Sequence, residues 1–88
     1  MRTPGYTTRF EKDLELAKRR GKDTDKLKTV INLIVLEQPL PPRLRDHALV
    51  GNYLGRRECH IEPDWLLVYK LEPGTVLFER TGTHSDLF

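Results

Sequence analysis

Apolar residues in the N-terminal half of the chain recur with the period of two amphipathic helices. Phe10, Leu14 and Ala17 stand at i, i+4 and i+7, which predicts a helix. Thr8, followed three residues later by Glu11, matches a capping box at its start. A second helix carries a broader apolar stripe with helical spacing: Leu27, Val30, Ile31, Ile34 and Val35. Because only a short polar link separates the two, they are predicted to form a helical hairpin.

The C-terminal half has the alternation and the turn signals of a β-sheet. Three segments joined by hairpin-length turns predict an antiparallel meander: 57–61, 65–71 and 75–80. In the first segment Cys59 and Ile61 alternate with Glu58 and His60, so the two pairs are expected on opposite faces. Helices followed by strands indicate an α+β fold of one domain, residues 1–88. In this fold an N-terminal helical hairpin packs on one face of a small antiparallel sheet.

The composition adds a few constraints on partners and location. Fifteen Lys and Arg against 13 Asp and Glu give a formal net charge of +2, which permits nucleic-acid binding without requiring it. The single cysteine, Cys59, excludes an intrachain disulfide and fits a reducing compartment. No apolar run approaches the roughly 18 residues of a membrane span, and the N-terminus lacks the apolar segment of a signal peptide. We expect a cytoplasmic protein with no membrane partner.

Three histidines, His47, His60 and His84, are the strongest candidates for chemistry. Imidazole both gives and takes protons near neutral pH. Each histidine alone also fits an ordinary structural role, in a loop, a sheet or a tail. Together with Asp64 they are good zinc-ligand types, but no His-x-x-x-His or Cys-x-x-Cys spacing is present. We therefore expect no metal and no other cofactor, and consider metal-free phosphodiester chemistry.

Three runs of residues are more specific than these patterns. They are Asp46-His47-x-Leu49-x-Gly51, Gly55-x-Arg57-x-x-His60-x-Glu62-Pro63-Asp64-Trp65-x-Leu67-x-Tyr69-Lys70 and Phe78-Glu79-Arg80-Thr81-Gly82-Thr83-His84-x-x-Leu87-Phe88. Together they resemble the YafQ branch of the RelE/ParE toxin superfamily. The similarity extends weakly into the predicted helices, so it spans almost the whole chain.

The resemblance implies a RelE-like fold and the toxin of a type II toxin–antitoxin system. Such a toxin is a ribosome-dependent endoribonuclease that cleaves mRNA in the ribosomal A site and inhibits translation. The implied chemistry is metal-free attack by a 2′-hydroxyl with histidine acid/base catalysis. The implied partners are the ribosome, mRNA and a cognate antitoxin of the DinJ or RelB type. The toxin–antitoxin complex is expected to bind operator DNA through the antitoxin.

By the same resemblance, the catalytic residues are expected to be His47, His60, Asp64 and His84. His84 would be one proton-transfer residue and His60 or His47 the other, while Asp64 would orient a histidine or act as the base. The residues expected to bind RNA or its phosphate are Arg80, Phe88, Trp65 and Glu58. Glu58 stands where relatives commonly have aspartate, which keeps the charge but moves it outward.

Arg80 and Phe88 lie in the last of the three runs and are expected to contact the substrate. The planar guanidinium of Arg80 would hold the phosphate, and Phe88 would stack on a base. Strict alternation puts Arg80 on the same face as Val76 and Phe78, which look like core residues. Either the strand twists at Arg80, or one of those two residues faces the cleft. Tyr53 stands where relatives commonly have tryptophan.

Two other classes of protein are compatible with parts of the sequence. One is a ParE-like toxin that acts on gyrase without ribonuclease activity; the three histidines and the Thr-Gly-Thr-His segment argue against it. The other is a binding module that recognises RNA or a protein without catalysis. Such a module would tolerate loss of the histidines while keeping its partner, whereas a ribonuclease would not.

Overall fold

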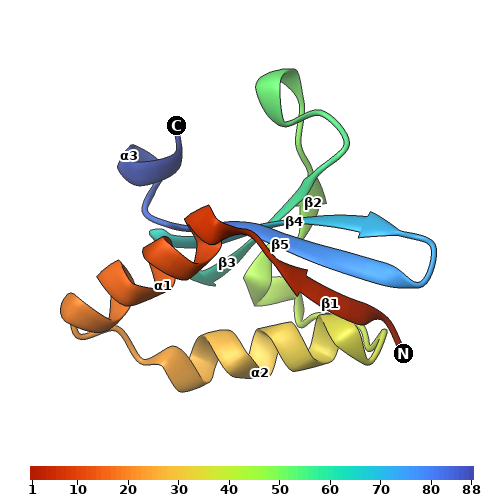
Figure 1. The fold of residues 1–88 in the computed structure, drawn as a ribbon, viewed down its shortest axis with the longest axis horizontal. Helices are drawn as coiled ribbons and strands as arrows, with labels where there is room; N and C mark the ends of the chain where they lie inside the picture. The colour runs from red at the N-terminus through yellow and green to blue at the C-terminus, as the bar shows by residue number, and fades with distance from the viewer.

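The computed structural model describes residues 1–88, which form three α-helices and five β-strands (Figure 1). The helices are α1 (Thr8–Arg19), α2 (Thr24–Val35) and α3 (His84–Leu87). The strands are β1 (Thr3–Tyr6), β2 (His47–Ala48), β3 (Arg57–Glu62), β4 (Trp65–Glu72) and β5 (Thr75–Gly82). Short 3₁₀ turns occupy Pro42–Leu44 and Gly51–Tyr53. None of the helices has the length and apolar character that crossing a bilayer would need.

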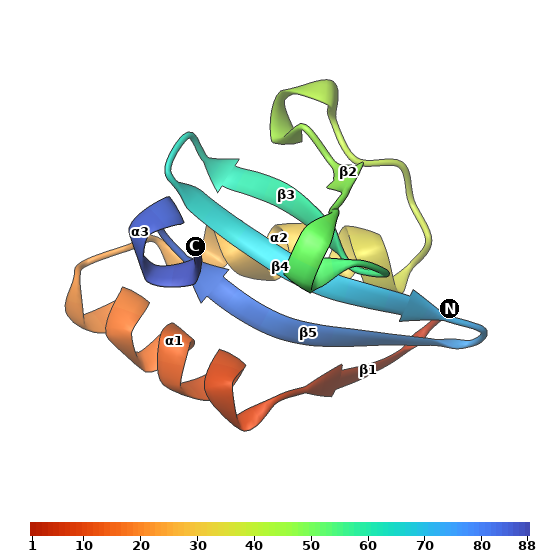
Figure 2. The same ribbon diagram turned by 90° about the horizontal axis from the view of Figure 1, so that it is seen from above.

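The strands form one sheet in the order β1-β5-β4-β3-β2. Strands β3 to β5 pair antiparallel as predicted, and the α+β class is confirmed. The short strand β2, which was not predicted, pairs antiparallel to β3. The sheet is mixed rather than purely antiparallel, because β1 pairs parallel to the edge of β5 with Thr3 opposite Thr75. In Figures 1 and 2, α2 lies across one face of the sheet and α1 runs beside β5, whereas α3 lies on the opposite face.

Both helices of the hairpin begin at capping side chains. The Oγ1 of Thr7 accepts a hydrogen bond from the Phe10 amide at 2.9 Å and donates to the Glu79 carbonyl at 2.8 Å. The predicted capping box at Thr8 and Glu11 is therefore wrong, because the cap is one residue earlier and also ties the helix to β5. Asp23 caps α2 by accepting from the Asp25 amide at 3.0 Å.

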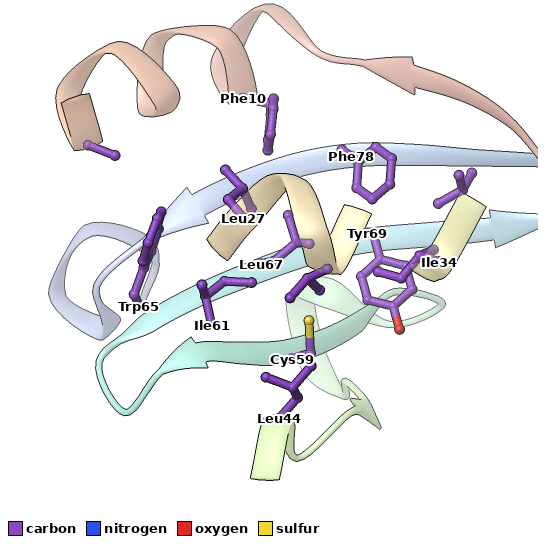
Figure 3. Close-up of a cluster of buried hydrophobic side chains, with 13 residues drawn as sticks. Phe10, Leu27, Ile34, Leu44, Cys59, Ile61, Trp65, Leu67, Tyr69 and Phe78 are labelled. Carbon is purple, nitrogen blue, oxygen red and sulfur yellow. The ribbon is translucent and has the colours of Figure 1, made fainter. Parts of the chain in front are cut away.

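The helices and the sheet share one main core (Figure 3). Its buried side chains include Phe10, Leu27, Ile34, Cys59, Ile61, Trp65, Leu67, Tyr69 and Phe78. Cys59 and Ile61 therefore face the helices, while Glu58 and His60 lie on the other side of β3, as the alternation predicts. Burial of this apolar surface is the main favourable contribution to folding.

A smaller apolar cluster covers the opposite face of β4. Leu66 and Val68 are fully buried there beneath Leu87 of α3, with Leu49 and Tyr53 packed at the margin. The central strand β4 is therefore buried on both faces. The cluster also seats α3 on the sheet, so the helix that carries His84 is held by apolar packing.

A β-bulge at Glu79 settles the orientation of Arg80. Val68 pairs with Arg80, but the next residue of β4, Tyr69, pairs with Phe78. Glu79 is thus an extra residue on β5, and it reverses the alternation at that point. Arg80 lies on the same face as Val68 and opposite to Phe78, which agrees with the first of the two predicted alternatives, a change in the strand at Arg80.

A buried hydrogen-bond chain joins β4 and β5 and provides a test of the packing. The Trp65 Nε1–H donates to Thr81 Oγ1 at 2.9 Å, and that hydroxyl donates to the Leu66 carbonyl at 2.7 Å. Thr81→Val leaves the indole donor buried without a partner, so we expect the free energy of unfolding to fall by about 1–3 kcal/mol. Urea unfolding measures this. The control Thr29→Val, at an exposed hydroxyl, should change it by less than about 0.5 kcal/mol; equal effects would contradict the assignment.

Candidate active site

The three histidines form a row on the sheet face that the helical hairpin leaves open. His47 lies on β2, His60 on β3 and His84 at the start of α3. The ring centroids of His47 and His60 are 6.3 Å apart, and those of His60 and His84 are 5.9 Å apart. Strand pairing and the return of the C-terminal segment therefore bring three acid/base groups side by side, with His60 next to both of the others.

His84 is bound twice by the Asp64 carboxylate. Oδ1 of Asp64 accepts from the His84 amide at 2.9 Å and lies 2.7 Å from ring Nδ1. The two hydrogen bonds from His84, first that of the backbone and then that of the ring, lower the pKa of Asp64. An ionised carboxylate only accepts, so Nδ1 carries the proton. Nε2 of the neutral ring then has a free lone pair, and half of the side chain is exposed to solvent.

Glu58 lies beneath the row, between His47 and His60. Its Oε1 is 3.6 Å from His47 Nε2 and 3.3 Å from His60 Nε2, and its side chain is only 7% exposed. This carboxylate faces the two imidazoles instead of the solvent, and its expected contact with RNA stays a prediction. One buried negative charge therefore stands below two groups that become cationic when they take up a proton.

The remaining ring nitrogens face backbone carbonyls. His47 Nδ1 lies 2.6 Å from the Arg45 carbonyl, and His60 Nδ1 lies 3.4 Å from the Pro63 carbonyl. Carbonyl oxygens only accept, so both Nδ1 atoms are oriented as donors. In the case of His60, both ring nitrogens face oxygens that only accept, and this environment accommodates the doubly protonated ring.

Asp46 anchors the loop before His47 to the core. Its carboxylate accepts from the buried Tyr69 hydroxyl and from Arg57 Nη2 at 2.9 Å. Burial, followed by the hydrogen bond to Asp46, raises the pKa of Tyr69. The sequence placed Asp46 near the histidines but gave no role to this trio. The only available signal was its position within the quoted runs.

Cys59 does not take part in this chemistry. The thiol lies in the core between the sheet and the helices, and its residue is fully buried. Burial raises the pKa of the Cys59 thiol to about 12. It therefore stays protonated and faces away from the histidines, as the alternation in β3 predicts.

A groove of about 520 Å³ opens beside the histidine row. The residues that line it come from the 3₁₀ turn before β2, the end of β3 and the start of α3: Arg43, Leu44, Arg45, His60, Ile61, Glu62, Pro63 and His84. No group of three or more His, Cys, Asp or Glu side chains is arranged to hold a metal ion. The groove thus joins two of the predicted catalytic residues to a surface rich in arginine.

Comparison with known proteins identifies the family. A family model described as "Bacterial toxin of type II toxin-antitoxin system, YafQ" matches residues 2–88. This chain belongs to the YafQ toxin family. Among its relatives is the mRNA interferase toxin YafQ of Escherichia coli strain K12, 46% identical over 84 residues, with 94% of this chain and 91% of the relative covered.

Solved structures of YafQ agree with the fold of this YafQ-family toxin. The crystal structure of YafQ from E. coli strain BL21(DE3) matches with a TM-score of 0.95 and 44% identity, and covers 100% of this chain and 99% of that one. The structure of the E. coli DinJ–YafQ toxin–antitoxin complex matches with a TM-score of 0.92 and 45% identity, and covers 99% and 97%. The resemblance read from the sequence is therefore confirmed.

The residues expected to bind RNA in this YafQ-family toxin are not all gathered at the row. Trp65 is 1% exposed and packs in the core on the other face, away from the row, and its expected contact with RNA stays a prediction (Figure 3). Arg80 lines a separate hollow and donates to Asp13 from Nε at 2.7 Å and from Nη2 at 3.3 Å. Phe88 is 59% exposed and contacts Tyr53 edge-on, with centroids 5.2 Å apart. The RNA-binding roles of Arg80 and Phe88 stay predictions.

A set of polar contacts at Asp86 fixes α3 in this YafQ-family toxin. Asp86 accepts from the Thr83 amide at 3.0 Å while Thr83 Oγ1 accepts from the Asp86 amide at 3.2 Å, which forms a capping box. Arg20, at the end of α1, donates to both Asp86 oxygens at 2.7 and 3.3 Å. The hydrogen bonds from Arg20, and to a smaller extent the one from the Thr83 amide, hold the pKa of Asp86 well below its usual range.

Asp86→Ala is expected to lower the free energy of unfolding at pH 7 by about 1–2 kcal/mol, because it removes a cap and an ion pair. A carboxyl whose folded pKa is depressed stabilises the fold above its unfolded pKa of about 3.9, and this contribution is lost as pH falls below that value. The difference from wild type should therefore shrink in acid. Urea unfolding between pH 7 and pH 3 measures it, with exposed Ser85→Ala as control. A difference that is constant with pH would contradict the role of the charge.

Proposed function

We propose that this YafQ-family toxin is an endoribonuclease that cleaves mRNA on the ribosome and so inhibits translation. The observation that supports it most is the row of three imidazoles, with one ring bound to Asp64 and two above Glu58. The E. coli relative is named an mRNA interferase toxin, which supports mRNA as the substrate. A row of this kind supplies both of the proton transfers that phosphodiester transfer needs.

The ring environments suggest a division of labour. Asp64 holds the proton of His84 on Nδ1, so the exposed Nε2 has a lone pair and is suited to accept a proton. His47 and His60 each have accepting oxygens at both ring nitrogens, so either is suited to carry a proton, and His60 is the one whose ring lies beside His84, with centroids 5.9 Å apart. We assign His84 as general base and His60 as general acid. His47 shares the Glu58 charge and completes the cationic surface.

In the proposed reaction one P–O bond forms, one P–O bond breaks, and two protons are transferred. His84 Nε2 takes the proton of the 2′-hydroxyl beside the scissile phosphate. The 2′-oxygen attacks phosphorus in line and forms a new P–O bond. The bond from phosphorus to the 5′-oxygen breaks, and His60 gives that oxygen a proton. The products are a 2′,3′-cyclic phosphate and a 5′-hydroxyl.

Charge that develops on the phosphoryl oxygens needs cations close by. The protonated imidazoles of His47 and His60 meet part of this need. Arg80 contributes if it reaches the phosphate through the one terminal guanidinium nitrogen that Asp13 does not bind. Phe88 would stack on an adjacent base, since more than half of its surface is exposed.

The partners follow from the family. The E. coli relative was crystallised with the antitoxin DinJ, and we infer an antitoxin of the same type for this chain. The toxin–antitoxin complex would bind operator DNA through the antitoxin. Because mRNA on the ribosome is the proposed substrate, the toxin acts in the cytoplasm.

A reconstituted translation reaction tests the proposal. Wild-type toxin should produce cuts in a defined mRNA when ribosomes are present and far fewer when they are omitted. The new 5′ ends should accept phosphate from a kinase without prior phosphatase treatment, because a 5′-hydroxyl carries no phosphate to remove. Intact mRNA in a reaction that contains ribosomes would overturn the ribonuclease proposal and favour a gyrase-directed toxin or a binding module.

A further inference from the structure

The arginines of this chain fall into two groups. Five lie within 4.0 Å of a carboxylate: Arg2, Arg20, Arg56, Arg57 and Arg80. The other four have no acidic partner at this distance: Arg9, Arg19, Arg43 and Arg45. An arginine that is already paired offers fewer free donors to a ligand. The unpaired arginines are therefore the ones whose full guanidinium fork remains available.

Two of the four unpaired arginines lie at the histidine row. Arg43 and Arg45 line the 520 Å³ groove together with His60 and His84. Leu44, between them, is buried in the main core, so it anchors the turn while its two neighbours are exposed. The lining of the groove thus combines two unpaired arginines with two of the histidines.

The backbone of the turn is set for this arrangement. Arg45 has φ 48° and ψ 45°, a left-handed conformation that costs a non-glycine residue about 1 kcal/mol or more. Amide hydrogen bonds from Leu44 to Pro41 and from Arg45 to Pro42, both 3.0 Å, hold the turn. The Arg45 carbonyl also accepts from His47 Nδ1. The same residue therefore orients a histidine with its backbone carbonyl and also lines the groove.

The one carboxylate that lines the groove is neutralised from outside it. Glu62 accepts hydrogen bonds from Lys22 and Lys26, each at 3.0 Å. The hydrogen bond from Lys26, followed in size of effect by the one from Lys22, lowers the pKa of Glu62. The Glu62 carboxylate is therefore ionised and paired. The charge left over in the groove is positive, which suits a phosphodiester.

We propose that Arg43 and Arg45 form a phosphate-binding wall that holds the RNA backbone next to the scissile linkage. The proposal rests on the proposed ribonuclease function and adds where the substrate strand runs. The strand enters along the groove between the 3₁₀ turn and the start of α3. On this basis these two arginines, more than the paired Arg80, determine the affinity for the strand.

Equilibrium binding tests the wall independently of cleavage. The probe is a fluorescent 2′-O-methyl RNA oligonucleotide of about ten nucleotides, which cannot undergo 2′-hydroxyl attack. Arg43→Ala and Arg45→Gly should each weaken binding about tenfold. Each should also reduce the slope of log affinity against log salt by about 0.7, the value for one lost phosphate contact on a single strand. Glycine suits the left-handed backbone of position 45, so the turn is kept.

Two controls separate the wall from a general effect of charge. Arg45→Lys keeps the cation and should keep most of the salt slope. Arg19→Ala removes an unpaired arginine from the last turn of α1, away from the groove, and should change affinity by less than about threefold. Binding that is undetectable for wild type at low salt, or equal for wild type and the groove variants, would overturn the proposal.

A second measurement distinguishes this proposal from the function on which it rests. On ribosomes, the groove variants should raise the toxin concentration at half-maximal cleavage about tenfold and change the saturating rate less than about threefold. If wild type leaves ribosomal mRNA intact, the ribonuclease function fails. The oligonucleotide binding assay still decides whether Arg43 and Arg45 bind an RNA backbone. If the variants lose affinity only for the antitoxin, the groove is a protein-binding site and the proposal is overturned.

Discussion

Replacing His84 by asparagine should lower the single-turnover rate of mRNA cleavage by about 10²–10⁴-fold. The amide nitrogen of asparagine occupies nearly the place of imidazole Nδ1, so it keeps the hydrogen bond to Asp64 and removes only the group at Nε2. The lost group is the proposed general base. Toxin in excess over programmed ribosomes, sampled over time, measures the rate without interference from product release.

Ser85→Ala is the matched control, because it changes the next exposed position of α3 without touching the row. It should cleave at the wild-type rate within about twofold. His84→Asn should also keep its thermal stability, since Thr83, Asp86 and Leu87 hold α3. A His84→Asn protein that is folded and cleaves at the rate of Ser85→Ala would remove His84 from the mechanism.

His60→Gln should reduce cleavage by a similar factor of about 10²–10⁴, for the opposite proton transfer. Glutamine places an amide nitrogen near the position of imidazole Nε2, 3.3 Å from Glu58 in the wild type, so the buried carboxylate keeps a donor. An alanine there would leave Glu58 with less compensation and would confuse folding with chemistry. Glutamine separates the two.

The pH dependence of the rate assigns the roles. A general base that must be unprotonated limits the rate on the acidic side, and a general acid that must be protonated limits it on the alkaline side. Residual activity of His84→Asn should lose the acidic limb, and that of His60→Gln the alkaline limb. If the limbs are lost in the reverse order, the two roles are exchanged. If both variants keep both limbs, other groups carry the protons.

Local patterns predicted the parts of the fold that repeat with a fixed period. The alternation in β3 gave the correct faces for Cys59 and His60, because a strand with one buried face allows a single register. The apolar stripe of α2 likewise marked Leu27, Val30 and Ile34, all of which are buried. These features depend on residues that are close in sequence, so the sequence contains the information directly.

Other features depend on pairs that are distant in the chain. The bulge at Glu79 is one inserted residue without a local signal, and it reverses the side of Arg80. Arg20 and Asp86 are 66 residues apart, so no spacing rule connects them. Trp65 shows a different limit. A family motif contains both residues that contact substrate and residues that hold the fold, and resemblance alone does not separate them.

The two faces of β3 also divide the consequences of mutation. Changes at Cys59 or Ile61 disturb packing, so in a cell they would mainly alter the abundance of folded toxin. Changes at the other face that keep the hydrogen bonds, such as His60→Gln, would mainly alter the activity of each folded molecule. Substitutions at successive positions of β3 would thus lower toxicity in two alternating ways, through the amount of folded toxin or through the activity of each folded molecule. A growth assay alone would confound these two effects unless the amount of toxin is measured beside it.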